Sequence, residues 1–151
     1  MSKKTSLAGI KQDGCAYPPP PWRSVGTTLI AASLIDVGQA RKYVPADLEI
    51  IEPRRGRTLG EIGIFEYGDG SVFSYNELVV ICGLARAGKR IGGWISHIYV
   101  DSTRSQAGGL ELFDLPKQLA SFTRSVKSGR FCFEIEAEDG YLLTATTPRV
   151  R

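Results

Sequence analysis

The sequence predicts a protein of the α+β class that is mainly antiparallel β, in which one sheet curls into a barrel or partial barrel with two short helices. Two observations support this prediction. Segments rich in β-branched and aromatic residues outnumber segments with helical periodicity, and turn sequences separate most of these segments. The length of 151 residues suits a single domain with a substantial core.

The clearest strand is expected at residues 130–138, where apolar and polar side chains alternate as in a strand with one solvated face. One face holds Phe131, Phe133, Ile135 and Ala137, and the other holds Cys132, Glu134, Glu136 and Glu138. Asp139-Gly140 is a strong hairpin signal that leads into a further strand at 141–147. Other segments with strand composition are 27–35, 58–67, 75–86 and 94–101, with a shorter extended piece at 48–53.

Two short helices are expected. Asp36 suits an N-cap with Gln39 three residues later, as in a capping box, and Pro45 ends that helix. Ala40 and Val44 belong to its inward stripe. The second helix is expected to begin at Pro116, because the missing N–H of a proline is not needed in a first turn.

The chain is expected to consist of a loose polar arm at 1–16 and one folded domain at 17–151. The domain begins with "YPPPPW", whose prolines favour extended polyproline geometry between two aromatic residues. This segment suits a stiff strap over the domain, and a ligand for a proline-binding partner is the alternative.

The composition argues against several classes of protein. The net charge is only +3, and the densest basic cluster, Arg54, Arg55 and Arg57, lies in a turn-like segment without aromatic residues, so no nucleic-acid partner is expected. The sequence shows neither a signal peptide nor an apolar run that could span a membrane, so we expect a cytoplasmic protein without a membrane partner.

The three cysteines, Cys15, Cys82 and Cys132, lie far apart and match no metal-binding or disulfide spacing. They are expected to be reduced thiols, and no metal site is predicted.

Lys117 is the first candidate for chemistry, since it lies in the mostly apolar run "LELFDLPKQLASF". In the first turn of a helix it would lie near the positive end of the dipole, and Leu115 and Leu119 could exclude water. Both effects disfavour the charged form of an amine, and a neutral amine can attack a carbonyl to form a Schiff base. A solvated surface charge is the alternative, and the local pattern alone does not separate the two.

The segments "PPPPW", "YNEL", "ISHIYVDS" and "GGLELFDLPKQLASF", taken in this order, resemble the acetoacetate decarboxylase family and its wider superfamily. The resemblance runs from about residue 18 to about residue 145. It implies the fold of that family, with Lys117 as the Schiff-base nucleophile. It also implies a lyase for a small keto acid or related carbonyl compound, by decarboxylation or aldol/dehydratase chemistry, without a cofactor.

The resemblance also implies that Glu77 and Glu61 are catalytic carboxylates that assist proton transfer. Strand alternation places each of them on a face with apolar neighbours, where a carboxylate must be paired or hydrogen-bonded. Each is therefore a site residue or a member of a buried ion pair, unless it is simply an exposed strand glutamate.

The chain departs from the family pattern at three positions. Gln118 stands where the decarboxylases have a second lysine, and Val25 and Leu110 stand where arginines are expected. Decarboxylation of acetoacetate itself is therefore less expected than other Schiff-base chemistry. Arg23 is the candidate replacement for the early arginine, and Arg23, Trp94 and Gln118 are the predicted substrate-binding residues.

Members of the family are considerably longer, so the chain resembles a member whose C-terminal part is missing. A pocket left open in this way could be covered by a second subunit, which predicts a homo-oligomer. The alternative function is a non-catalytic small-ligand-binding protein or a degenerate relative that has lost activity.

Overall fold

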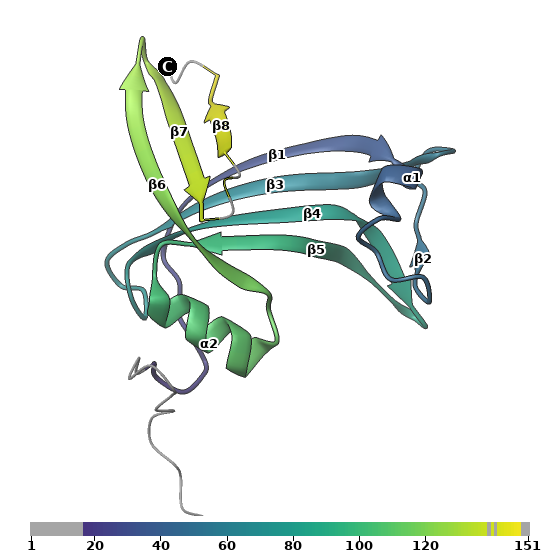
Figure 1. The fold of residues 1–151 in the computed structure, drawn as a ribbon, viewed down its shortest axis with the longest axis horizontal. Helices are drawn as coiled ribbons and strands as arrows, with labels where there is room; N and C mark the ends of the chain where they lie inside the picture. Colours follow the sequence, from purple (N-terminus) through teal and green to yellow (C-terminus); the bar gives the residue numbers. More distant parts are fainter. Residues whose placement is uncertain (1–16, 139, 141, 149–151) are drawn as a thin grey trace, which may run out of the picture. The chain divides into compact units, whose positions relative to one another are not determined.

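A computed structural model describes residues 17–138, 140 and 142–148, and Figure 1 shows the fold. The predicted loose arm at 1–16 lies outside the described residues, as do Asp139 and Tyr141 of the predicted hairpin turn. The elements in chain order are β1 (Gly26–Asp36), α1 (Val37–Ala40), β2 (Glu49–Ile50), β3 (Arg57–Tyr67), β4 (Tyr75–Ala87), β5 (Arg90–Val100), α2 (Thr103–Phe113), β6 (Lys117–Lys127), β7 (Arg130–Ala137) and β8 (Leu142–Thr146).

The strands follow the order β1-β3-β4-β5-β6-β7-β8 in the sheet, and β2 pairs with β4. The pairs β2/β4, β6/β7 and β7/β8 are antiparallel. The predicted class, mainly antiparallel β with two helices, is confirmed, and every predicted strand overlaps an observed one.

The chain divides into two compact units. The described residues of the first unit lie within 17–27, 66–77 and 99–148, and those of the second within 28–65 and 78–98. Strands β1, β3, β4 and β5 contribute residues to both units.

The second unit contains α1 and a compact apolar core. Asp36 is the N-cap, and its carboxylate accepts hydrogen bonds from the backbone N–H groups of Gly38 and Gln39 at 2.8 and 3.2 Å. The predicted capping box is not completed, because the Gln39 side chain accepts from Lys42 instead. The core cluster consists of Ala40, Val44, Ile50, Cys82 and Ala85.

In the first unit, β6, β7 and β8 form a meander whose alternation largely follows the predicted pattern. Phe133 and Ile135 are buried, while Glu134 and Glu136 are exposed. Cys132 is an exception, since it is buried on the predicted polar face. It pairs in register with Thr146 of β8, and the Thr146 hydroxyl lies 3.8 Å from the Cys132 sulfur.

The second helix was predicted in the wrong place. The structure has α2 at Thr103–Phe113, and Lys117 begins the strand β6. The Ser102 side chain caps α2 by accepting from the Ser105 N–H, and Asp114, with a left-handed φ of 53°, ends it. Pro116 then disfavours helical backbone at Leu115, so the chain continues as an extended segment.

The polyproline strap is anchored by aromatic packing within the first unit. Trp22 contacts Tyr17, Phe73 and Phe113 edge-on, with ring centroids 5.1–6.3 Å apart. Its indole N–H donates to the Pro18 carbonyl at 2.8 Å. These contacts suit the predicted strap. Among the described helices, none has the length and hydropathy that a membrane span requires.

Candidate active site

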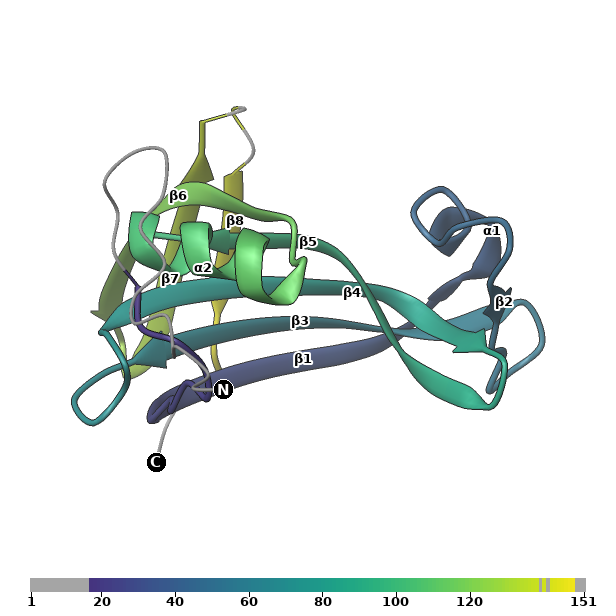
Figure 2. The same cartoon turned by 90° about the horizontal axis from the view of Figure 1, so that it is seen from below.

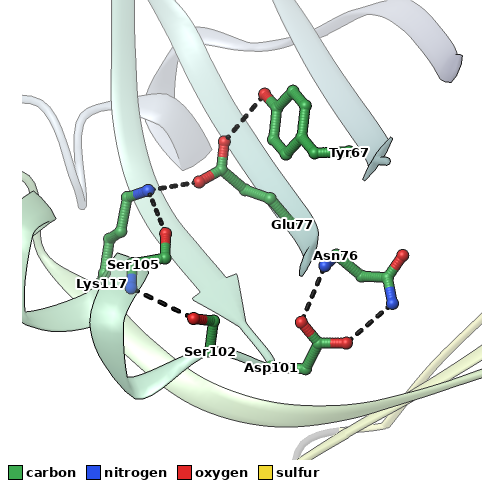
Figure 3. A network of polar contacts seen from close by, with 7 residues as sticks. All are labelled: Tyr67, Asn76, Glu77, Asp101, Ser102, Ser105 and Lys117. Atoms are coloured by element: carbon green, nitrogen blue, oxygen red, sulfur yellow. Dashed lines mark hydrogen bonds and ion pairs between the residues drawn. The ribbon is translucent and has the colours of Figure 1, made fainter. Parts of the chain in front are cut away.

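A buried ion pair between Lys117 and Glu77 lies at the centre of the candidate site (Figure 3). Lys117 is the first residue of β6, and Glu77 is the third residue of β4. The two residues are only 6% and 8% exposed. Lys117 Nζ donates to Glu77 Oε2 at 2.5 Å and to Ser105 Oγ at 3.0 Å. A buried ammonium is thus held by one carboxylate and one hydroxyl.

The surroundings of Lys117 differ from the prediction. Because Lys117 follows α2 and begins a strand, it does not lie in the first turn of a helix, and the dipole argument for its activation is wrong. Its alternative, a solvated surface charge, is wrong as well, since the side chain is buried. The amine is instead buried, and it lies beside two hydrogen-bond acceptors, Glu77 and Ser105.

Two tyrosines complete the surroundings of the pair. The Tyr67 hydroxyl donates to Glu77 Oε1 at 3.4 Å, and Lys117 Nζ lies 5.4 Å from the centre of the Tyr75 ring. The two tyrosine rings are 4.7 Å apart. The ammonium therefore faces both a carboxylate and the negative face of an aromatic ring.

Burial, followed by the charge of Glu77, raises the pKa of Tyr75 to about 12. The same two causes, in the same order, raise the pKa of Tyr67 well above its usual value. For Tyr75, a hydrogen bond with Ser105 acts in the opposite direction but is outweighed. Both phenols therefore stay protonated to a higher pH than an ordinary tyrosine, and can donate hydrogen bonds.

A second polar contact holds the β4 segment that carries Glu77. The Asp101 carboxylate accepts from the backbone N–H of Asn76 and from its side-chain amide, both at 2.7 Å. Asn76 lies between Tyr75 and Glu77, so this bidentate contact fixes the backbone on which both side chains are carried (Figure 3).

Of the predicted site residues, Lys117 and Glu77 contact each other within the first unit. Glu61 and Trp94 belong to the second unit, where Glu61 is half-buried on β3 and Trp94 packs against the core cluster. Arg23 lies in the first unit, and its side chain is exposed. The predicted roles of Glu61, Trp94 and Arg23 stay predictions.

Gln118 is exposed, and strand alternation places it on the face of β6 opposite Lys117. It lines a hollow with Gln106, Leu119 and Glu138. A lysine at this position would extend away from the buried amine. The resemblance to the decarboxylases made the missing second lysine a notable departure, but on this strand a lysine at position 118 would have little effect on the Lys117 amine. Substrate binding by Gln118 stays a prediction.

Sequence reasoning missed Tyr67, Tyr75 and Ser105. The alternation in "YNE" places Tyr75 on the same face as Glu77, and this signal could have identified it. Ser105 could be found only once α2 was placed, because it reaches Lys117 from the helix. Within the described ranges, no cluster of three or more His, Cys, Asp or Glu side chains suits a metal ion.

Comparison with known proteins places the chain in a family. The family model for acetoacetate decarboxylase (ADC) matches residues 10–148. The acetoacetate decarboxylase of Legionella pneumophila superimposes with a TM-score of 0.70 at 22% identity, covering 86% of this chain and 50% of that one. The enduracididine biosynthesis enzyme MppR, in complex with the condensation product of pyruvate and imidazole 4-carboxaldehyde, gives a TM-score of 0.66 at 17% identity, covering 85% and 56%.

Curated relatives are found among plant proteins. The Protein NEOXANTHIN-DEFICIENT 1 of Solanum lycopersicum is 29% identical over 120 residues, which is 78% of this chain and 40% of that protein. The protein of the same name from Arabidopsis thaliana is 28% identical over 116 residues, with coverages of 77% and 41%. The chain thus spans about two fifths of the length of these relatives. Since the family model matches nearly the whole sequence, the chain belongs to the acetoacetate decarboxylase family.

Proposed function

We propose that this chain acts as a lyase that forms a Schiff base between Lys117 and a small keto acid or related carbonyl compound. The observation that carries the proposal is the buried contact of Lys117 Nζ with Glu77 Oε2, supported by Ser105. A buried lysine beside a proton acceptor is the arrangement that nucleophilic catalysis by an amine requires.

The reaction would begin with proton transfer from Lys117 Nζ to Glu77 Oε2. The neutral amine then attacks the carbonyl carbon, the π electrons of the C=O bond move to its oxygen, and a proton passes from the nitrogen to that oxygen. The resulting carbinolamine loses its hydroxyl group as water. Glu77, now a carboxylic acid, returns a proton to that leaving hydroxyl. The product is an iminium ion, which can accept the electron pair released by decarboxylation or by an aldol-type step.

The two tyrosines can stabilise the charges that form in these successive steps. Tyr67 donates to the Glu77 oxygen that does not contact Lys117, so it can stabilise the carboxylate whenever the proton is elsewhere. The Tyr75 ring lies near Nζ and can stabilise a positive charge there, both on the ammonium and on the iminium.

The comparisons support the proposal without deciding the substrate. Structures with the same fold include an acetoacetate decarboxylase and MppR in complex with a condensation product of pyruvate. In line with the sequence, we propose Glu61 as a second acid or base and Arg23, Trp94 and Gln118 as substrate contacts. A homo-oligomer in the cytoplasm, with no metal or cofactor, completes the proposal.

The test is borohydride reduction in the presence of pyruvate, acetoacetate and a range of other small keto acids and ketones, followed by peptide mapping. We expect one reduced adduct at Lys117, and no adduct in Lys117→Arg. Lys127, an exposed lysine at the far end of the same strand, is the internal control that should stay unmodified. Adducts spread over surface lysines, or no adduct with any compound, would contradict the proposal.

The second candidate function is non-catalytic binding of a small ligand. It is favoured by one observation, namely that Lys117 already has two hydrogen-bond partners, as in an ion pair whose role is purely structural. This function predicts that a ligand stabilises the protein against thermal unfolding while borohydride traps nothing.

A further inference from the structure

The helix α2 packs beside β6 (Figure 2). The side chain of Lys117 lies against this helix. The contact is made at Gly109, a buried residue one turn from the end of α2. A Cβ atom at Gly109 would lie only 2.8 Å from Lys117 Cε and 3.0 Å from Cγ. Any side chain at position 109 would therefore force the lysine stem away from the helix.

The amine end of the same side chain meets α2 one turn earlier. Ser105 lies four residues before Gly109, so the two share one face of the helix. Ser105 is fully buried, and its Oγ accepts from Lys117 Nζ at 3.0 Å. The Ser102 N-cap holds the backbone of Ser105 by accepting from its N–H at 3.2 Å. The stem of Lys117 thus rests on Gly109 while its amine is held at Ser105.

The neighbouring glycine serves a different contact. A Cβ atom at Gly108 would collide with the Trp22 indole ring and come within 3.3 Å of Tyr17, at the polyproline strap. The Gly108-Gly109 pair therefore allows two separate close approaches, one by an aromatic ring and one by Lys117. Substitution of Gly108 or of Gly109 by alanine therefore gives a matched pair in a single helix, of which only the second disturbs Lys117 directly.

We propose that the face of α2 formed by Ser105 and Gly109 is a positioning element that holds the Lys117 amine at Glu77. A lysine side chain is long and flexible, so without a fixed surface its amine would sample many positions. The groups facing the amine are Glu77 and Tyr75 from β4 and Ser105 from α2. As a statement about catalysis, the inference rests on the function proposed above.

The first test compares Gly109→Ala with Gly108→Ala by NMR, using 13C-labelled lysine and no substrate. The wild type should show contacts between the Hε protons of Lys117 and the Hα protons of Gly109. In Gly109→Ala, the Lys117 Cε resonance should shift and its contacts with Ser105 should vanish. In Gly108→Ala, the melting temperature should fall because Trp22 must move, but the Lys117 resonance should stay in place.

Borohydride trapping then measures the catalytic consequence in the same variants. Misplacing a reacting group by about 1 Å can cost roughly a hundredfold in rate, so Gly109→Ala should trap a keto acid roughly a hundred times more slowly than wild type. Gly108→Ala should stay within about twofold of wild type once rates are corrected for the folded fraction.

Ser105 is tested with a second pair. Ser105→Ala removes a hydrogen bond to a charged group and should slow trapping roughly tenfold, while Ser105→Thr keeps a hydroxyl and should recover most of the rate. The keto acid concentration at half-maximal rate should be unchanged, since Ser105 holds the amine and not the substrate.

The outcomes separate the two claims. If the wild type traps no carbonyl compound, the proposed function is wrong, and the Lys117 resonances still decide whether α2 positions the amine. If Gly109→Ala and Gly108→Ala give the same Lys117 resonances, the positioning role of α2 is overturned, whatever trapping shows.

Discussion

At the scale of the residue, the central feature is a charged pair that is almost fully removed from water. Lys117 and Glu77 each lose hydration on burial, and their mutual attraction compensates for this loss only because further groups are satisfied as well. Ser105 accepts from the ammonium and Tyr67 donates to the carboxylate. Removing one partner would leave the other as an uncompensated buried charge.

A double-mutant cycle measures this coupling. Glu77→Gln or Lys117→Met alone should lower the free energy of unfolding by about 3 kcal/mol, because each leaves an unpaired charge. The double variant should recover much of that loss but trap no keto acid. Chemical denaturation provides the measurement.

Glu134→Gln is the control for this cycle, since it breaks the exposed pair with Lys127, whose atoms are 4.0 Å apart. It should change the free energy of unfolding by no more than about 0.5 kcal/mol. Additive losses in the double variant would show that Lys117 and Glu77 are not energetically coupled.

The raised pKa values of Tyr67 and Tyr75 predict that the folded chain loses stability in alkaline solution. The pKa of Tyr75 rises on folding from 10.0 to about 12, so the folded chain holds this proton more tightly than the unfolded chain. Its contribution is complete below about pH 10 and is lost as the pH rises towards about 12. The pKa of Tyr67 is shifted in the same direction. The free energy of unfolding, measured at about pH 9 and about pH 11, should therefore fall less in Tyr75→Phe than in wild type. Equal losses would be the contrary result.

At the scale of the element, every predicted strand was found, but β6 was missed because its start was predicted as the second helix. The alternation at 130–138 and the hairpin glycine were enough to predict β7 and its turn into β8. The sequence of α2 contains two glycines and only a weak apolar stripe, so nothing in its periodicity indicated a helix. The preceding proline misled the prediction for Lys117, because Pro116 ends the connection to β6 and does not begin a helix.

The strand geometry of β6 predicts that the residue after Lys117 has little influence on the Lys117 amine. Gln118→Lys adds a cation on the opposite face of β6, in water, where its charge is screened from the buried amine. At saturating keto acid, the maximal rate of borohydride trapping should stay within about twofold of wild type, and only the keto acid concentration at half-maximal rate should change, because Gln118 is a proposed substrate contact. A large effect of Gln118→Lys on the maximal rate would mean that the side chains at 117 and 118 are closer than the strand places them.

The pairing of Lys117 with Glu77 could not be predicted from local patterns. The two residues are 40 positions apart, and their contact depends on strands and a helix that come from different parts of the sequence. The resemblance to a family supplied both residues, but it did not supply Tyr67, Tyr75 or Ser105. Those three follow from the burial and packing of the folded chain.

At the scale of the whole molecule, the described polar network lies entirely within one of the two units. Lys117, Glu77, Ser105, Tyr67 and Tyr75 all belong to the first unit, while the predicted site residues Glu61 and Trp94 belong to the second. The groups proposed to act in imine formation, Lys117 and Glu77, therefore belong to the same unit.

Exchange of the substrate's carbonyl oxygen with solvent tests the central claim most directly. Formation of a Schiff base expels the carbonyl oxygen as water, and its hydrolysis brings in an oxygen from solvent. With a small keto acid in 18O-labelled water, the wild-type chain should accelerate 18O uptake well above the protein-free rate, and Lys117→Arg should not. Uptake no faster than in buffer for every compound tested, or equal acceleration by Lys117→Arg, would contradict a Schiff base at Lys117.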